Sequence, residues 1–245
     1  MSDRQRTAII TGASRGIGAE IARQLAKDDI AVAVNYANSP DAAERIVAEI
    51  RAAGGQAQAI QADLTDPAAP CVLFDAAEAA FGGIDILVNN AGMMQLSSLG
   101  ESDDAMLDAH VSLNLAAPVR LMREAARRLP EGGRIVSLSS SVVGLYQPGY
   151  GLYAATKAGI EALTHVLAKE LGPKGITVNA VAPGPVATDF FLRGKSDALV
   201  AQIEGMNPFG RLGTPEDIAR VVRFLSGTEA AWISGQVIRA NGGVV

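Results

Sequence analysis

The chain has 245 residues, of which 49% are hydrophobic, and a formal net charge of -5 at pH 7. This length suits one large α/β domain, so we expect a single domain over residues 1–245. The negative charge argues against a nucleic-acid partner, because nucleic-acid-binding domains usually carry a basic excess. No apolar run approaches the roughly 18 residues of a membrane helix. The apolar stretch near the start is too short for a signal peptide, so we expect a cytoplasmic protein with no membrane partner.

Short β-branched runs alternate with alanine-rich stretches of helical period along the whole chain. We expect strands at residues 7–10, 31–35, 57–61, 84–88, 134–137, 177–181 and 236–239. Several of these runs are apolar on both faces, and such strands need helices on both sides of their sheet. The pattern therefore predicts an α/β fold, a doubly wound three-layer sandwich with a mainly parallel seven-stranded sheet.

Local chemistry marks three helix starts and one irregular segment. A capping side chain precedes a proline at Ser39-Pro40, Asp66-Pro67 and Thr214-Pro215, and proline is favourable in the first turn of a helix. Residues 183–209 hold several glycines and prolines between the sixth strand and the last helix. We expect this segment to be a mobile substrate loop with short helices that closes over a ligand.

A glycine-rich turn follows the first strand directly. Residues 11–18 read Thr-Gly-Ala-Ser-Arg-Gly-Ile-Gly, and a helix is expected to open at about Ala19. Gly12 permits a tight turn, Gly16 lets the backbone approach a pyrophosphate, and Gly18 lets the helix pack on the strand. A helix N-terminus also offers free N–H groups to phosphates, so the turn predicts a dinucleotide site, although its glycine spacing departs from G-x-G-x-x-G.

The end of the second strand bears on the choice of dinucleotide. It reads Val-Asn-Tyr-Ala at residues 34–37, where NAD-binding folds usually place an acid for the ribose 2′-hydroxyl. With Asn35 in that place and Arg15 in the preceding turn, a 2′-phosphate is accommodated and paired. NADP(H) is therefore favoured, and NAD(H) remains the alternative. Ser39 is either a phosphate contact or a helix cap, and the cap is favoured.

Tyr153 and Lys157 lie four residues apart at the start of a predicted helix, so their side chains share a face. A nearby ammonium group favours the phenolate of a tyrosine, whose pKa is ordinarily near 10. At about 5 Å and an effective dielectric of about 20, this attraction is of order 3 kcal/mol, or roughly two pKa units. Ser140, thirteen residues before Tyr153, would donate a second hydrogen bond to a substrate oxygen. Only this spacing distinguishes Ser140 from Ser139 and Ser141.

Further motifs accompany these residues in a fixed order. They are Asn89-Asn90-Ala91-Gly92, Asn114, Tyr-Ala-Ala-Thr-Lys at 153–157, and Pro183-Gly184. Together with the glycine-rich turn, this set resembles the short-chain dehydrogenase/reductase family over nearly the whole chain. The resemblance implies a Rossmann fold and an NAD(P)-dependent oxidoreductase. Among family members, the chain looks most like the 3-oxoacyl-thioester (acyl-carrier-protein) reductases and related ketone reductases.

The resemblance also implies roles for individual residues. Tyr153 would be the acid and base, Ser140 would orient the carbonyl, Lys157 would hold the nicotinamide ribose, and Asn114 would hold a water that links Lys157 to solvent. The cofactor-binding residues that it implies are Gly12, Ser14, Arg15, Gly16, Ile17, Gly18, Asn35, Asp63, Leu64, Asn90, Ala91, Gly92, Tyr153, Lys157, Pro183, Gly184, Val186 and Thr188. It further implies a homotetramer or a homodimer.

The hypothesis that follows is reversible hydride transfer from NADPH to the carbonyl of a ketone, a 3-oxoacyl thioester or a related compound. Apolar residues in the segments 142–151 and 186–209 would form the substrate wall. One alternative is an NAD-dependent dehydrogenase of a secondary alcohol or polyol. A remote alternative is a non-catalytic nucleotide-binding sensor, which would have no chemical need for the serine, tyrosine and lysine together.

Other residues of chemical interest have simpler interpretations. Cys71 is the single cysteine, so it forms no internal disulfide, and we expect a half-buried helix residue. His110 and His165 lie in helical segments without a second ligand at a suitable spacing, so we expect no metal site. Trp232 belongs either to the core or to a subunit interface, and the family resemblance favours the interface.

Overall fold

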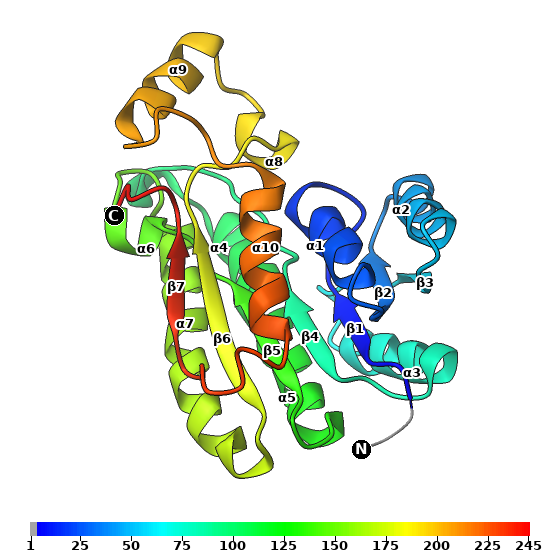
Figure 1. Ribbon diagram of the computed structural model, residues 1–245. Coiled ribbons are helices and arrows are strands. Elements are labelled where there is room, and N and C mark those ends of the chain that lie inside the picture. The colour runs from blue at the N-terminus through cyan, green and yellow to red at the C-terminus, as the bar shows by residue number, and fades with distance from the viewer. Residues whose placement is uncertain (1–3) are drawn as a thin grey trace.

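Seven parallel strands form one sheet in the computed structural model, which describes residues 4–245 (Figure 1). The strands are β1 (Thr7–Ile10), β2 (Ala31–Tyr36), β3 (Ala57–Gln61), β4 (Ile86–Asn89), β5 (Arg134–Leu138), β6 (Thr177–Pro183) and β7 (Val237–Ala240). Their order in the sheet is β3-β2-β1-β4-β5-β6-β7. The chain reverses its direction of strand addition between β1 and β4, and such switch points are where open α/β sheets bind ligands.

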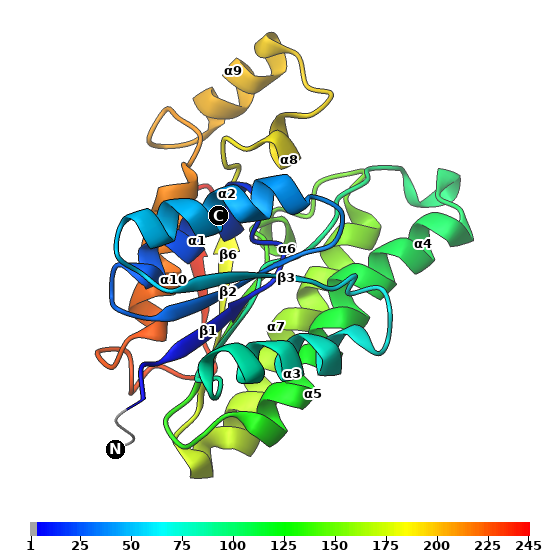
Figure 2. The ribbon, with the colours of Figure 1, turned by 90° about the vertical axis from the view of Figure 1, so that its right-hand side faces the viewer.

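Helices cover both faces of this sheet (Figure 2). One face carries α1 (Gly16–Ala26), α2 (Pro40–Ala52) and α10 (Pro215–Ser226), and the other carries α3 (Ala69–Phe81), α5 (Ala117–Arg128) and α7 (Gly151–Leu171). Side chains of a strand alternate between the two layers: Ile10 packs with the first group of helices and Ile9 with the second. The predicted doubly wound three-layer sandwich is confirmed, and its sheet is wholly parallel.

Shorter elements surround the carboxyl ends of the strands. They are a 3-10 turn (Leu99–Glu101), α4 (Asp104–Val111), a π-helical turn (Ser112–Ala116) that joins α4 to α5, α6 (Val142–Leu145), a 3-10 turn (Gly172–Lys174), α8 (Asp189–Leu192) and α9 (Asp197–Met206). In Figure 1, α8 and α9 stand above this edge of the sheet. The segment 183–209 therefore contains the short helices that its composition indicated.

Several predicted boundaries moved, most of them by one or two residues. The strand β4 begins at Ile86 instead of residue 84, and α1 begins at Gly16, three residues before the expected start. The helix α3 begins at Ala69 and not directly after Asp66, because the Asp66 carboxylate accepts the N–H of Ala68 at 2.8 Å in a separate turn. Turn chemistry of this kind competes with helix capping at the same residue types.

The other two helix starts were placed correctly. Thr214 caps α10 with a reciprocal pair of bonds: its hydroxyl accepts the N–H of Asp217 at 3.2 Å, and the Asp217 carboxylate accepts the N–H of Thr214 at 2.8 Å. Ser39 lies at the N-cap of α2, but its side chain makes no capping hydrogen bond. Ser39 therefore occupies the predicted cap position, and it caps α2 through its backbone carbonyl, which accepts the N–H of Ala43 at 3.1 Å.

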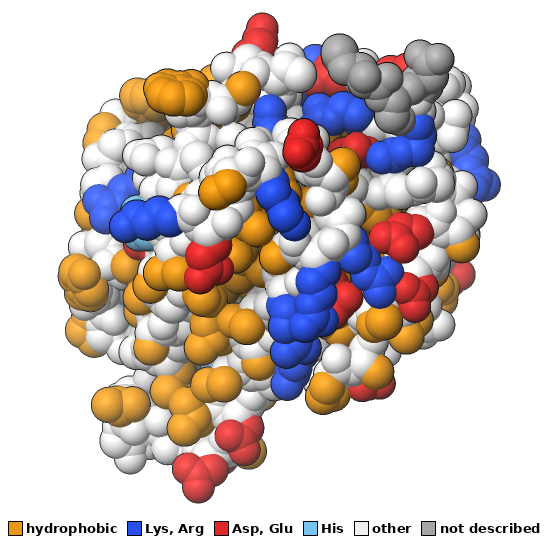
Figure 3. Space-filling model, turned by 90° about the horizontal axis from the view of Figure 1, so that it is seen from below, with side chains coloured by type: hydrophobic (Ala, Val, Ile, Leu, Met, Phe, Trp, Pro, Cys, Tyr) orange, Lys and Arg blue, Asp and Glu red, His pale blue; other side chains and the backbone are white. Residues whose placement is uncertain are grey.

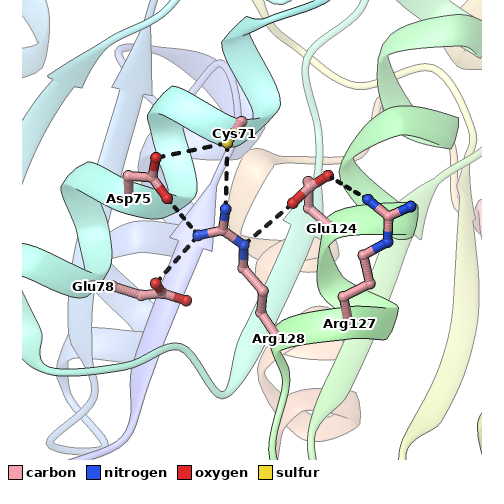
Figure 4. Close-up of polar contacts among 6 residues, drawn as sticks. All are labelled: Cys71, Asp75, Glu78, Glu124, Arg127 and Arg128. Carbon is pink, nitrogen blue, oxygen red and sulfur yellow. Dashed lines mark hydrogen bonds and ion pairs between the residues drawn. The ribbon is translucent and has the colours of Figure 1, made fainter.

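Arg128 ties α5 to α3 on the second face of the sheet (Figure 4). Its guanidinium donates to Asp75 at 2.6 Å, to Glu78 at 3.2 Å and to Glu124 at 3.2 Å. It also donates to the sulfur of Cys71 at 3.3 Å. Cys71 is exposed rather than half-buried, because it lies on the outer side of α3 beside this cluster.

Within residues 4–245, no helix is both long enough and apolar enough to cross a membrane. Residues 1–3, which open the N-terminal stretch considered for a signal peptide, lie outside the described part of the chain.

Candidate active site

A cavity of about 570 Å³ opens at the carboxyl ends of the central strands. Most of the residues predicted for the site line it, namely Gly12, Ser14, Arg15, Gly16, Ile17, Asn35, Asp63, Leu64, Asn90, Ala91, Gly92, Ser140, Tyr153, Lys157, Pro183, Gly184, Val186 and Thr188. Two predicted residues, Gly18 and Asn114, lie outside this lining. The strands end together at this edge of the sheet, so residues far apart in the chain meet there.

The glycine-rich turn between β1 and α1 is packed on one side and open on the other. A Cβ on Gly12 would lie 3.0 Å from the Cα of Ala91, and one on Gly18 would lie 2.4 Å from the amide nitrogen of Asn90. A Cβ on Gly16 would meet only the methyl group of Thr188, at 3.6 Å, but its φ of +57° favours glycine. The turn therefore needs Gly12 and Gly18 for packing, and it leaves an open backbone cradle that fits a pyrophosphate.

Asn90 holds this turn in place. Its side-chain amide donates to the carbonyl oxygens of Thr11 at 2.8 Å and Gly12 at 3.1 Å. In return, the Thr11 hydroxyl accepts the N–H groups of Asn90 at 2.9 Å and Ala91 at 3.0 Å. The Asn-Asn-Ala-Gly segment at the end of β4 thus supports the turn through four hydrogen bonds. A ligand in the cavity would contact the opposite side of this segment.

Asn35 is buried at the end of β2 and its amide contacts protein on both sides. Its Oδ1 accepts the N–H of Gly12 at 3.2 Å, and its Nδ2 donates to the carbonyls of Ile60 at 3.3 Å and Ala62 at 3.1 Å. A carboxylate at this position could not donate to those two carbonyls. The end of β2 therefore carries no acid, and Arg15, which lines the same cavity, is exposed. This combination fits a phosphate on the adenosine ribose.

Asp63 lies just after β3 on the same wall. Its carboxylate accepts hydrogen bonds from the backbone N–H and the hydroxyl of Thr65, at 3.0 and 2.8 Å, and these bonds lower the pKa of Asp63. Leu64 beside it is 3% exposed. Both residues line the cavity, and their predicted role in cofactor binding stays a prediction.

Tyr153 and Lys157 stand on the buried side of the first turns of α7, with exposed fractions of 8% and 5%. The Lys157 Nζ lies 5.7 Å from the centre of the Tyr153 ring and donates to the carbonyl of Leu138 at 2.7 Å. Ser140, two residues beyond β5, lines the same cavity as Tyr153, and its hydroxyl acts to lower the pKa of the Tyr153 phenol. The structure therefore brings together the three side chains that the sequence selected.

The electrostatics of this group differ from the prediction. Burial raises the pKa of Tyr153 to about 12, and the hydrogen bond from Ser140 acts in the opposite direction. Burial also lowers the pKa of Lys157 to about 8. Both side chains are withdrawn from water, which disfavours the charged form of each. The expectation that Lys157 lowers the pKa of Tyr153 below its ordinary value was therefore wrong for this structure.

The three consecutive serines have different partners. Ser139 donates to the carboxylate of Glu161 at 2.7 Å, and Ser141 accepts a hydrogen bond from the amide of Asn241 at 2.9 Å. Ser140 accepts the N–H of Val142 at 3.3 Å, and of the three serines it is the one whose hydroxyl affects the pKa of Tyr153. Position along the strand end thus selects Ser140, in agreement with the thirteen-residue spacing.

Asn114 lies in the π-helical turn and is fully buried. Its amide forms a reciprocal pair with the backbone of Met93: Oδ1 accepts the N–H at 2.8 Å, and Nδ2 donates to the carbonyl at 2.8 Å. A Cβ on Gly92 would lie 3.1 Å from this Oδ1 and 3.7 Å from the Lys157 Nζ. Asn114 and Lys157 are therefore neighbours around Gly92, while the water that Asn114 would hold stays a prediction.

Sequence reasoning missed Tyr150 and Met94, which also line the cavity. Burial raises the pKa of Tyr150, and Tyr150 in turn raises that of Tyr153. Its position three residues before Tyr153 was a signal for a shared helix face.

His110 is fully buried, and its Nε2 accepts a hydrogen bond from the N–H of Gln95 at 3.3 Å. This bond fixes the backbone next to Met94, which lines the cavity. Among residues 4–245, no cluster of three or more His, Cys, Asp or Glu side chains could hold a metal ion.

Comparisons with known proteins agree with this geometry. Residues 12–245 match a family model described as Enoyl-(Acyl carrier protein) reductase. A short-chain type dehydrogenase/reductase of Picea abies is 44% identical over 98% of this chain and 92% of its own length. A chloroplastic NADPH-dependent aldehyde reductase-like protein of Arabidopsis thaliana is 41% identical over 98% of this chain and 94% of its own.

The solved structures are equally similar. A short chain dehydrogenase from Burkholderia cenocepacia, crystallised in complex with NADP, is 41% identical, with a TM-score of 0.93 over 99% of each chain. The fold, the ordered site residues and these matches define one class of protein. This chain belongs to the short-chain dehydrogenase/reductase family, whose members are NAD(P)-dependent oxidoreductases.

Proposed function

We propose that this chain is an NADPH-dependent reductase that transfers hydride reversibly to the carbonyl carbon of a ketone or aldehyde. One observation carries the proposal: Ser140, Tyr153 and Lys157 line the same cavity as the glycine-rich turn, and the Ser140 hydroxyl is close enough to Tyr153 to lower the pKa of its phenol. Two hydroxyl groups that converge in this way are placed to donate to a single oxygen atom. The aldehyde reductase activity in the name of the Arabidopsis relative supports the same reaction class.

The residues of the cradle would hold the two ends of the dinucleotide. Gly12, Gly16 and their neighbours would bind the pyrophosphate, and Arg15 would pair with the 2′-phosphate. Asp63 and Leu64 would flank the adenine, with the Asn-Asn-Ala-Gly segment beside them. The NADP in the Burkholderia structure and the lack of an acid at the end of β2 both support NADP(H) over NAD(H).

The opposite part of the wall would hold the nicotinamide end. Lys157 would bind its ribose, and the residues after β6 would contact the ring, namely Pro183, Gly184, Val186 and Thr188. When bound, the nicotinamide supplies the hydride. The remaining chemistry concerns the substrate oxygen, which gains negative charge as the carbonyl is reduced.

Tyr153 gives that oxygen its proton. Burial raises the pKa of Tyr153 to about 12, so the phenol is protonated at neutral pH and available as an acid. Ser140 keeps its own proton and donates a hydrogen bond to the same oxygen. The phenolate that remains on Tyr153 is attracted to the Lys157 ammonium, which gives it a proton. Lys157 is then reprotonated from solvent through the water expected at Asn114. The reverse sequence would oxidise an alcohol.

The substrate side of the cavity is apolar. Val142, Leu145, Phe190 and Phe191 line it, and among the lining residues only Arg15 and Lys157 are cationic. Both cations would be engaged by the cofactor, so the carbonyl would be bound through a neutral, apolar part of the substrate. A 3-oxoacyl chain and related ketones have this character, and a free keto acid would lack a counter-charge.

The experiment follows the absorbance of NADPH with purified protein and a panel of acyl thioesters, diketones, aldehydes and sugars. Tyr153→Phe should abolish turnover, because the proton donor is lost, while NADPH binding measured by fluorescence titration stays nearly intact. Unchanged turnover in this variant would remove Tyr153 from the mechanism. Faster reaction with NAD and a secondary alcohol or polyol would establish the dehydrogenase alternative, and turnover of no panel member with either cofactor would favour the sensor.

We further propose that the chain forms one domain, acts in the cytoplasm and assembles as a homotetramer or homodimer. Trp232 is 99% exposed, which excludes it from the core of this chain and supports its place at an interface. Val119 of α5 and Val166 of α7, two helices on the same face of the sheet, are 37% and 54% exposed. Exposed apolar side chains of this kind favour contact with a second copy.

A further inference from the structure

Asn241 follows β7 directly and is only 9% exposed. Its Nδ2 donates to the hydroxyl oxygen of Ser141 at 2.9 Å and to the carbonyl of Val245 at 3.1 Å. Its Oδ1 accepts the N–H of Gly243 at 3.0 Å. The side chain is thus fully engaged, and it does not line the cofactor cavity. One of its contacts is with Ser141, in the segment that carries Ser140, and the other two are with the C-terminal residues.

Ser141 is the neighbour of Ser140, and it is fixed from two directions. Its N–H donates to the carbonyl of Pro183 at 2.9 Å, and its hydroxyl donates to the carbonyl of Ala182 at 3.2 Å. Asn241 supplies the third contact by donating to the same hydroxyl oxygen. The backbone that precedes Ser141, and with it the position of Ser140, is therefore held against the ends of β6 and β7.

Asn241 also supports both ends of the segment 183–209. The amide of Asn207, at the end of α9, donates to the carbonyl of Asn241 at 2.9 Å, and its Oδ1 accepts the N–H of Phe209 at 2.8 Å. At the other end, a Cβ on Gly184 would lie 2.9 Å from the Cβ of Asn241. Contact this close means that the chain leaving β6 rests directly on Asn241.

We propose that Asn241 is a positioning residue for the reduction. Its side-chain amide holds the Ser140 hydroxyl in register with Tyr153, while its backbone carbonyl and Cβ contact the two ends of the segment that carries the substrate wall. The inference rests on the proposed function only in that Ser140 donates to the substrate oxygen. Loss of one such donor costs about 10² to 10³ in kcat. Misplacement by about 1 Å costs up to about 10², so the effect of losing Asn241 should lie below that of losing Ser140.

The first measurement compares Asn241→Ala with a matched control. We expect Asn241→Ala to lower kcat by roughly ten- to a hundredfold, with NADPH affinity by fluorescence titration unchanged. Asn179→Ala is the control, because Asn179 is also buried and its amide also bridges two backbone groups, Ile233 at 2.8 Å and Gln236 at 3.0 Å. Both variants should unfold at lower temperature, but Asn179→Ala should keep its kcat. An equal fall of kcat in the two variants would overturn the proposal.

The second measurement repeats Asn241→Ala in a Ser140→Ala background. If Asn241 acts through Ser140, the two losses in kcat will not add, and the double variant will resemble Ser140→Ala alone. If Asn241→Ala lowered kcat by the same factor in the wild type and in Ser140→Ala, the inference would be contradicted. Should Asn241→Ala fail to fold, Ser141→Ala removes the acceptor instead, and it should lower kcat in the same non-additive way. Full turnover by Ser140→Ala would instead overturn the role of Ser140 itself, and with it this inference.

Discussion

Burial shifts the pKa values of Tyr153 and Lys157, and both shifts suit the proposed reaction. The phenol is held in its protonated form and the amine is brought toward neutrality, with pKa values of about 12 and about 8. A protonated phenol is the form that reduction consumes, and an amine that titrates near neutral pH is suited to pass protons on. The same two shifts imply that the ammonium form of Lys157 destabilises the folded chain.

Lys157→Met should therefore stabilise the protein while it abolishes reduction. In the unfolded chain the pKa of Lys157 returns to 10.5, against about 8 when folded, so the unfolded state binds more protons between these pH values. The free energy of unfolding of the wild type should rise with pH across this window. The variant should lack that rise and should be the more stable protein below about pH 8.

Urea denaturation of both proteins at several pH values measures this difference, because all other titrating groups cancel in the comparison. Parallel stability curves for the two proteins would show that Lys157 is not destabilised by burial. The hydrogen bond from Lys157 to Leu138 is also lost in the variant, which offsets part of the gain by about 1 kcal/mol.

Among the elements, α3 and α5 share a hydrophobic core and are joined at the surface by the side chain of Arg128. Arg128 is 22% exposed and bonds to two carboxylates of α3 as well as to Glu124 of its own helix, while its guanidinium lies 5.7 Å from the centre of the Phe74 ring. Neighbouring Arg127 is 65% exposed and pairs only with Glu124. Networks of this kind contribute more than isolated surface pairs.

Arg128→Ala should lower the free energy of unfolding by about 1 kcal/mol through lost ion pairs and lost packing on Phe74. Arg127→Ala should leave stability unchanged within error, and both variants should keep the kcat of the wild type because the cluster is remote from the cavity. Thermal melts of the two variants test this. Equal melting temperatures would show that the contacts in Figure 4 do not couple the two helices.

At the scale of the whole molecule, apolar side chains gather on part of the surface that Figure 3 shows, beside a row of lysine and arginine side chains. The exposed valines of α5 and α7 would be buried if a second copy covered these helices. Such burial would bring two copies of α7, which carries Tyr153 and Lys157, close together. Contacts with the second copy would then hold α7 in place, in addition to the contacts within this chain.

Val166→Glu should therefore shift the protein toward smaller species, because a charge is costly in an apolar interface. Val72→Glu is the matched control, since Val72 lies on α3 and is 53% exposed against 54% for Val166. Light scattering over a range of concentrations gives the mass of each variant. A smaller mass for both variants, or for neither, would argue against an interface at α7.

Sequence alone predicted many of the residues that line the cavity but less of their geometry. The glycine-rich turn, Ser140, Tyr153 and Lys157 were found because local spacing and strand order decide which residues meet at the carboxyl edge of a parallel sheet. Asn35 was identified from its position at the end of the second strand. Its role in fixing the glycine-rich turn was not predicted, because its partners Ile60 and Ala62 lie in and just after another strand. Tyr150 lies in the segment 142–151 expected for the substrate wall, but its contact with the catalytic group was not predicted, because it precedes the first residue of α7.

The sequence by itself determined the order of strands and helices, the glycines of the cradle and the chemical types that face the cavity, since these follow from local conformational preference and periodicity. Only the tertiary structure decided the protonation of Tyr153 and Lys157, the partner of each serine and the place of Asn241 beneath them. Those properties depend on burial and on contacts between segments as much as a hundred residues apart, such as Asn241 and Ser141. No local sequence pattern specifies how deeply a side chain is buried in the folded protein.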